Sequence, residues 1–123
     1  MGNKSELAIY NHKNGHTCSG AIMCAFADEA NMTSEQARKD SMPYAGGKMG
    51  KCGAVLAAEH ILRKRFSGKE ASEKIDELEA RFMRMNSSVI CRELKGLDTG
   101  KVLRNCRGCV TDAAVILEDL IGN

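Results

Sequence analysis

The sequence contains one proline and few aromatic residues, and it has no long hydrophobic run. Because proline interrupts helices and Pro43 is the only one, long stretches of the chain are free to be helical. No run approaches the roughly 20 apolar residues that span a membrane, and residues 1–10 lack the apolar stretch of a secretory signal. These absences predict a cytoplasmic protein without a membrane-spanning segment.

The sequence also has no large excess of positive or negative charge. Its net charge is only +2, and acidic and basic residues are interspersed. The densest basic run, residues 63–65, has Phe66 beside it but no wider set of aromatic side chains. These features give little support for nucleic-acid binding. The length of 123 residues suits one hydrophobic core, so we expect a single domain over residues 1–123.

The chain lacks the strict alternation of apolar and polar residues that marks half-buried strands. Apolar residues recur instead at helical spacing, most regularly in residues 110–121. Thr33 is followed by Gln36 as in a capping box, and Asn105 suits the N-cap of the last helix. We therefore expect an all-α, single-domain bundle of about five helices, at residues 17–30, 33–42, 52–66, 69–85 and 105–121.

Glycine is concentrated in residues 42–53, which contain four of the twelve glycines. Such a segment is typical of a loop whose backbone takes unusual angles or closely approaches a neighbour. A second irregular segment covers residues 86–100, where two serines can cap a short helical turn at residues 91–94 and Gly96 can end it. Both segments predict breaks between the longer helices.

Cysteine is abundant for a chain of this size. The six are Cys18, Cys24, Cys52, Cys91, Cys106 and Cys109. In a cytoplasmic protein they indicate metal binding or thiol chemistry more than structural disulfides. Free cysteine is also among the most buried residue types, so each one taken singly suits a purely structural role.

Three cysteines, Cys18, Cys52 and Cys106, fall in the first turn of an expected helix, on the face that carries its core residues. There the free amide groups and the positive end of the helix dipole lower a thiol pKa and favour the thiolate that binds metal. The irregular segment can deliver Cys91 as a fourth ligand. Cys109 lies one turn after Cys106, so either of these two can ligate. We therefore expect these cysteines to converge on one redox or metal site.

Cys24 and the three histidines are weaker candidates. Cys24 lies six residues after Cys18, about 120 degrees around the helix, which favours a place in the core. His16 is near enough to Cys18 to tune it or to act as an alternative ligand, although a surface or capping role is favoured. His12 and His60 belong to no metalloprotease motif, and no hydrolase constellation is visible.

Short motifs of known chemistry do not match. Residues 46–52 resemble a phosphate-binding loop only superficially, because Lys51 is followed by cysteine where that motif has serine or threonine. Cys106 and Cys109 form a CxxC pair, but Val110 stands where haem attachment needs histidine, and no strands support a thioredoxin fold. A structural zinc site usually takes two close cysteine pairs, and this sequence has one.

Several short runs taken together resemble one protein family. They are Cys18, the run Gly50–Val55, the run Cys91–Leu94, and Cys106 followed by Val110, Asp112, Ala113 and Ala114. In these runs the chain resembles the redox-active proteins named C_GCAxxG_C_C over nearly its whole length. The central motif departs at its last position, where Ala57 replaces glycine.

The resemblance implies an all-helical domain with four shared cysteines, most naturally Cys18, Cys52, Cys91 and Cys106. A similar domain forms part of split-Soret cytochromes, in which cysteines hold an iron–sulfur cluster. Haem is not implied, because this sequence lacks their attachment motif. The leading hypothesis is a [2Fe–2S] cluster bound by those four cysteines, with Cys109 as an alternative ligand. It would serve electron transfer or redox sensing with an unidentified partner protein.

Three alternatives stay open. The first is a thiol–disulfide redox protein that uses Cys106 and Cys109. The second is a zinc-stabilised interaction module, and the third is a helical domain with buried structural cysteines. The sequence decides neither enzymatic activity nor the presence of a homodimer.

Overall fold

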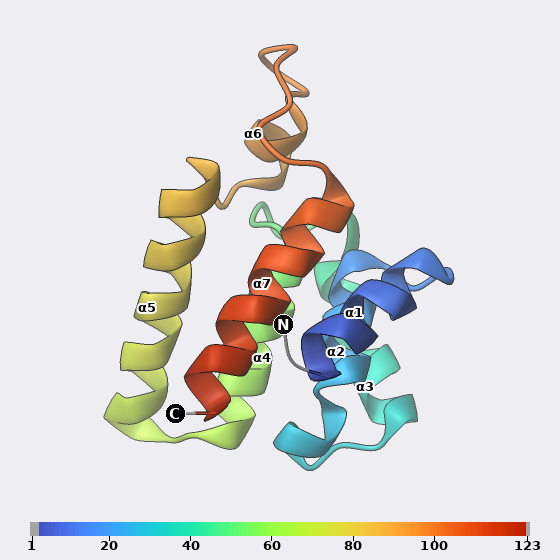
Figure 1. The fold of residues 1–123 in the computed structure, drawn as a ribbon, viewed down its shortest axis with the longest axis vertical. Coiled ribbons are helices and arrows are strands. Elements are labelled where there is room, and N and C mark those ends of the chain that lie inside the picture. Colours follow the sequence, from blue (N-terminus) through green and yellow to red (C-terminus); the bar gives the residue numbers. More distant parts are fainter. Residues whose placement is uncertain (1–2, 123) are drawn as a thin grey trace.

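The computed structural model describes residues 3–122 and is all-α, as predicted (Figure 1). Those residues form no strand, and Lys51 and Ile90 make an isolated antiparallel β-bridge. Their helices are, in chain order, α1 (Asn3–Lys13), α2 (Cys18–Ala25), the 3-10 helix η1 (Ala27–Ala30), α3 (Ser34–Ser41), the 3-10 helix η2 (Met42–Gly47), α4 (Gly53–Arg65), α5 (Gly68–Asn86), α6 (Cys91–Lys95) and α7 (Cys106–Gly122).

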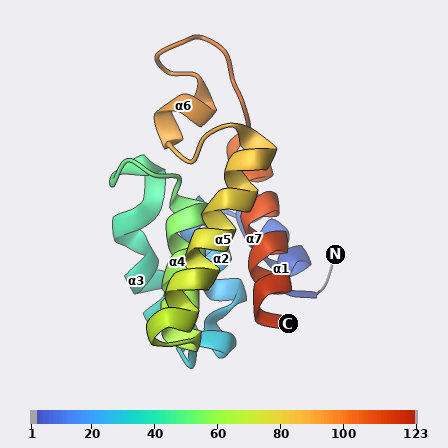
Figure 2. The same cartoon turned by 90° about the vertical axis from the view of Figure 1, so that its left-hand side faces the viewer.

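The helices pack around a core that lies between α2, α4 and α7. Helices α4, α5 and α7 run side by side, and α2 packs against both α4 and α1 (Figures 1 and 2). The core side chains Ile22, Phe26, Val55, Ile61 and Leu117 are fully buried. Helix α6 and the loop after it extend beyond the other helices at one end of the molecule (Figures 1 and 2). None of the helices within residues 3–122 is long and apolar enough to cross a membrane.

Side-chain caps fix several helix starts. The capping box predicted at Thr33 is present, because the hydroxyl of Thr33 accepts from the amide of Gln36 and the Gln36 side chain accepts from the amide of Thr33. Asn105 caps α7 by accepting from the Gly108 amide at 2.7 Å, also as predicted. Thr17 caps α2 through the Gly20 amide. These caps place the first residues of α2 and α7, both of them cysteines.

The expected number of about five helices is too low, because residues 3–122 contain seven α-helices. Helix α1 was not expected, since it is polar and buries only Ser5 and Ala8, so it has no regular apolar stripe. The turn expected at residues 91–94 is a helix in its own right, α6. The expected helix over residues 17–30 is divided, because α2 ends at Ala25 and η1 follows.

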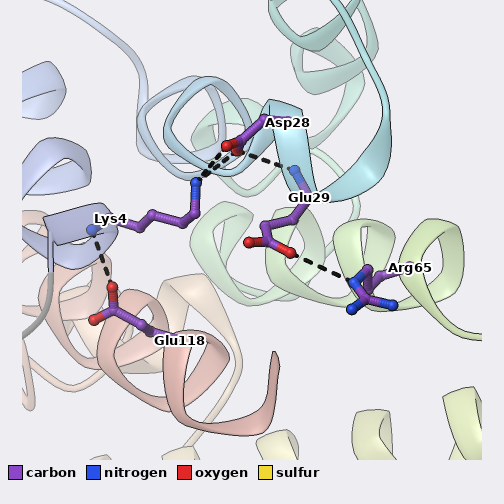
Figure 3. A network of polar contacts seen from close by, with 5 residues as sticks. All are labelled: Lys4, Asp28, Glu29, Arg65 and Glu118. Atoms are coloured by element: carbon purple, nitrogen blue, oxygen red, sulfur yellow. Dashed lines mark hydrogen bonds and ion pairs between the residues drawn. The ribbon is translucent and has the colours of Figure 1, made fainter. Parts of the chain in front are cut away.

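Polar contacts of Lys4 attach the start of α1 to the rest of the fold (Figure 3). The ammonium group of Lys4 contacts both carboxylate oxygens of Asp28, at 2.6 and 2.7 Å. The backbone amide of Lys4 donates to Glu118 on α7. Nearby, Arg65 at the end of α4 contacts Glu29 on η1 (Figure 3). The contacts of Lys4 thus join α1 to η1 and α7, in addition to the packing of α1 against α2 and α7.

Candidate functional site

One cavity in the structure is lined by five of the six cysteines. They are Cys18, Cys52, Cys91, Cys106 and Cys109, together with Gly53, Leu94, Lys95 and Arg104. The cavity has a volume of only about 10 Å³, so the side chains that line it nearly fill it. The structure therefore brings together all four cysteines predicted to share a site, and it adds Cys109.

Each of the four predicted cysteines lies at the start of a different helix. Cys18, Cys91 and Cys106 are the first residues of α2, α6 and α7, and Cys52 is the N-cap of α4. Sequence reasoning placed three of them at helix starts but assigned Cys91 to irregular chain. Because α6 has only five residues, no periodic apolar pattern could mark it.

Backbone hydrogen bonds join the chain segments that carry Cys52 and Cys91. The amide of Cys52 donates to the carbonyl of Val89 at 2.7 Å, and the amide of Cys91 donates to the carbonyl of Gly50 at 3.0 Å. These bonds flank the bridge between Lys51 and Ile90. The pairing fixes the spacing of two cavity cysteines that are far apart in sequence.

Two glycines of the segment predicted to approach its neighbours closely make room for the sulfur atoms. A Cβ on Gly47 would lie 2.7 Å from the Sγ of Cys91, and one on Gly53 would lie 2.7 Å from the Sγ of Cys18. Such separations are too short for carbon and sulfur to tolerate. Gly47 also has a φ of +73°, which favours glycine by itself. Close approach is therefore the reason for glycine at position 53.

Cys52 and Cys109 interact with each other inside the cavity. The thiol of Cys109 donates a hydrogen bond to the sulfur of Cys52, and this bond lowers the pKa of Cys52 to about 7. Burial opposes that shift, while the amides of Val55 and Ala54 at the start of α4 add to it. The same hydrogen bond raises the pKa of Cys109. Sequence reasoning missed this pair, because it paired Cys109 with Cys106, its neighbour along the helix.

Helix starts do not lower every thiol pKa, contrary to expectation. Burial raises the pKa of Cys18, outweighing hydrogen bonds from the amides of Gly46 and Ser19. Burial likewise raises the pKa of Cys91, with the nearby charge of Lys95 opposing it. At Cys18 the cost of desolvating a thiolate outweighs the stabilisation that the helix start provides.

Two cations that sequence reasoning did not identify line the cavity. The ammonium group of Lys95 donates a hydrogen bond to the sulfur of Cys106. This hydrogen bond raises the pKa of Lys95. Arg104 packs over Gly108. A Cβ added to Gly108 would lie 2.3 Å from the Nε atom of Arg104. The guanidinium is held there by Asp112, with Nε 3.1 Å from the carboxylate. Lys95 makes the cavity more favourable for anionic sulfur, whereas the charge of Arg104 is balanced by Asp112.

Cys24 and the three histidines lie outside this cavity. Cys24 is half-buried against the core, with its sulfur 4.0 Å from the carbonyl of Ser34, in agreement with its expected separation from the other cysteines. His60 faces the hydroxyl of Tyr44, and His12 faces Arg107. Within residues 3–122, no three or more His, Cys, Asp or Glu side chains form a group that could hold one metal ion.

Comparison with known proteins gives one match. No curated protein and no solved structure matches the chain. A protein family described as "Putative redox-active protein (C_GCAxxG_C_C)" matches residues 16–120, a range that contains all six cysteines. The match covers most of the chain, so this protein belongs to the C_GCAxxG_C_C family of redox-active proteins.

Proposed function

We propose that the cavity binds an iron–sulfur cluster, of the [2Fe–2S] type, for electron transfer or redox sensing. The ligands are the cysteines at the four helix starts, Cys18, Cys52, Cys91 and Cys106. The observation that supports this proposal is that four elements far apart in sequence deliver one thiol each to the same cavity. Buried structural cysteines have no need to meet in this way.

The surroundings of the thiols suit an anionic group. Four thiolates are the usual ligand set of a [2Fe–2S] cluster, and the complete group carries negative charge. Amides at the starts of α2 and α4 bond to Cys18 and Cys52, while Lys95 adds positive charge. When bound, the cluster supplies a one-electron redox couple. The chain supplies the ligands and the positive surroundings that stabilise them.

A cluster and a zinc ion would use the cavity cysteines differently. A structural zinc ion takes four ligands on one centre, whereas a [2Fe–2S] cluster divides its four cysteines between two irons. Since the side chains nearly fill the cavity, loading it requires the cysteines to move apart.

Metal analysis of the full chain, purified without oxygen, tests the proposal. We expect iron and acid-labile sulfide in equal amounts, and serine at any one of Cys18, Cys52, Cys91 or Cys106 should reduce both. Cys24→Ser is the matched control, because Cys24 is a half-buried cysteine outside the cavity, and it should load fully. A colourless protein without iron or sulfide would disprove the cluster, and stoichiometric zinc would support the zinc-stabilised module.

A second function is favoured by one observation, the hydrogen bond between Cys52 and Cys109. A thiolate beside a thiol can be oxidised to a disulfide, releasing two electrons and one proton. A partner disulfide that accepts them, with a second proton from solvent, becomes a dithiol. Mass spectrometry after trapping at controlled potentials would then show a reversible bond between Cys52 and Cys109. A bond between Cys106 and Cys109 would support the pairing expected from the sequence.

A further inference from the structure

Lys95 is the last residue of α6, and it lines the cavity together with the four cysteines that we propose as ligands. Its ammonium group donates a hydrogen bond to the sulfur of Cys106, and the thiols of Cys18 and Cys91 act on it electrostatically. The charge of Lys95 in turn acts on Cys52. Four helix starts thus deliver their cysteines to the surroundings of one ammonium group.

No carboxylate within residues 3–122 forms a salt bridge with Lys95, whereas the other cations near the cysteines are paired. Arg104, the second cation that lines the cavity, pairs with Asp112 at 3.1 Å. The further pairs at this end of the molecule are Lys51 with Glu59 and Glu79, and Arg92 with Asp98. Glu93, the acidic residue of α6, accepts from the hydroxyl of Ser88 and does not line the cavity. Lys95 is therefore the source of net positive charge among the side chains that line the cavity.

The backbone beside Lys95 is held by the fold. The buried residue Leu94 accepts through its carbonyl from the amides of Leu103 and Arg104, at 2.9 and 3.1 Å. These two bonds tie the end of α6 to the segment that leads into α7, where Cys106 lies. Lys95 itself is half-buried. The place of its ammonium group thus follows from the fold, unlike that of a freely moving surface lysine.

We propose that Lys95 is a positioning residue that raises the reduction potential of the site by stabilising its reduced state. The proposal rests on the cluster proposed above. Reduction takes one electron from a partner or a chemical reductant, breaks no bond, and adds one negative charge to the group that the four cysteines hold. A half-buried positive charge beside that group stabilises the reduced state more than the oxidised one, because little water lies between them to screen it.

Removing the charge of Lys95 while keeping the length of its side chain tests the proposal. In Lys95→Met, we expect the ratio of reduced to oxidised protein at a fixed potential to fall about tenfold, which corresponds to a reduction potential lower by about 59 mV. Lys95→Arg keeps the charge and should change the potential much less. A potentiometric titration of the loaded full chain with redox dyes, followed by visible absorption, measures both variants.

Lys101→Met is the matched control for the loss of one positive charge. Lys101 is an exposed cation in the segment between α6 and α7, and it does not line the cavity. Water and salt screen such a charge, so this variant should keep the wild-type potential. Urea unfolding of each variant shows whether it folds as the wild type does.

The metal-free chain provides a second measurement. Burial raises the pKa of Cys91, and the charge of Lys95 opposes that rise. Alkylation of Cys91 near neutral pH should therefore slow about threefold or more in Lys95→Met and stay close to the wild-type rate in Lys95→Arg, as measured by mass spectrometry. Cys24 lies outside the cavity and serves as the reference within the same chain.

An unchanged potential in Lys95→Met, or equal shifts in Lys95→Met and Lys101→Met, would overturn the proposal. Equal shifts in Lys95→Met and Lys95→Arg would overturn it as well, because the shape of the side chain would then be responsible. If Lys95→Met does not load, the alkylation of Cys91 decides, and an unchanged rate would count against any action of Lys95 on the thiols. Failure of the cluster itself appears separately, as a wild-type chain without iron or sulfide, and would overturn both proposals.

Discussion

Among single residues, Cys52 has the most distinctive environment. It is the one cavity cysteine that combines an N-cap position, amide donors and a neighbouring thiol donor, and its pKa falls to about 7. The other buried thiols, Cys18, Cys91 and Cys109, have raised pKa values. Since the thiolate is both the nucleophile and the metal ligand, the lowered pKa of Cys52 favours the reactive form of this cysteine.

Removing the thiol of Cys109, which donates to Cys52, should show how far the lowered pKa of Cys52 depends on that hydrogen bond. In Cys109→Ala, we expect the pKa of Cys52 to rise well above 7, because burial is then opposed only by amides and by the charge of Lys95. In the metal-free protein, alkylation of Cys52 near neutral pH should slow about tenfold or more, as measured by mass spectrometry. Cys24→Ala is the control and should leave the rate unchanged. An unaltered pH profile in Cys109→Ala would show that the amides alone hold the thiolate.

Glu59 is a second residue with an unusual environment, although it lies outside the cavity. It is 4% exposed, one of its carboxylate oxygens has no hydrogen-bond partner, and Lys51 is 3.9 Å away. Burial, together with the carboxylate of Glu79, raises the pKa of Glu59 to about 8. The raised pKa favours the protonated form of Glu59 at neutral pH, beside the carboxylate of Glu79 on α5.

The raised pKa of Glu59 predicts a specific pH dependence of stability. The folded protein keeps a proton that the unfolded chain releases above the ordinary pKa of 4.5, so the free energy of unfolding falls as pH rises from about 4.5 to about 8. Gln cannot titrate, and Glu59→Gln should be more stable than wild type above about pH 8, by an amount on the order of 1–3 kcal/mol. Near pH 5 the difference should be small.

Urea unfolding at several pH values between about 5 and 9 measures this difference. Glu77→Gln is the matched control, because Glu77 is an exposed α5 residue that pairs with Arg81, and its pKa is lowered. Glu77 is ionised in both the folded and the unfolded chain over most of this range, so its variant should differ from wild type by a nearly constant amount. A constant difference for Glu59→Gln as well would contradict the raised pKa.

At the scale of secondary structure, the site is formed by four helix starts and by the glycine-rich segment of residues 42–53. Four helices present their first residues to the cavity, and Gly53 lets α4 begin directly against Cys18 and η2. A Cβ at this position would lie 2.6 Å from the carbonyl oxygen of Tyr44 as well as 2.7 Å from the Sγ of Cys18. The tight junction of α2, η2 and α4 thus depends on the missing side chain.

Alanine at position 53 tests this junction, because it favours a helix in general but clashes here. We expect Gly53→Ala to lower the free energy of unfolding by about 1–3 kcal/mol and to reduce cluster loading, since Cys18 must move. Gly122→Ala is the control: no atom lies within 4 Å of its added Cβ, so its stability should change by less than about 0.5 kcal/mol. A stabilised Gly53→Ala would show that the junction is not tight.

The parts of the fold that were predictable from sequence are those encoded locally. The capping box at Thr33, the N-cap at Asn105 and the apolar stripe of α7 each lie within a few residues, and each was predicted. Helix α1 was missed because it has no regular apolar stripe and is held by packing against α2 and α7, which its own sequence does not encode. Local signals thus gave the long apolar helices and failed for the polar one.

The candidate site also has a part that was predictable from the sequence and a part that was not. That thiols at helix starts meet in one cavity was inferred for Cys18, Cys52 and Cys106, and the structure brings them together with Cys91. Their role as ligands stays a prediction. The hydrogen bond of Cys52 with Cys109 joins α4 to α7, and no spacing in the sequence encodes it. Such pairings arise from tertiary packing and become visible only in the folded chain.

For the molecule as a whole, the important contrast is between a well-packed bundle and a weakly attached α6. Helices α2, α4 and α7 contact one another closely, whereas α6 has its main contact with η2. Helix α6 nevertheless carries Cys91, and Lys95 at its end reaches Cys106. The element with the least packing therefore holds one ligand of the proposed cluster, and loading must affect it most.

Hydrogen exchange with and without the cluster tests this coupling. Loading ties the start of α6 to three inner helices, so amide exchange in residues 91–105 should slow about tenfold or more, while exchange in α4 and α7 changes less. The thermal midpoint should rise as well, because the cluster binds only the folded chain. Cys91→Ser removes the tie, and its α6 should exchange as fast in iron-loading conditions as in the metal-free protein. Equal slowing in all helices would instead mean that α6 is already as firmly held as the bundle, and that the cysteines of the cavity need no movement to accept a cluster.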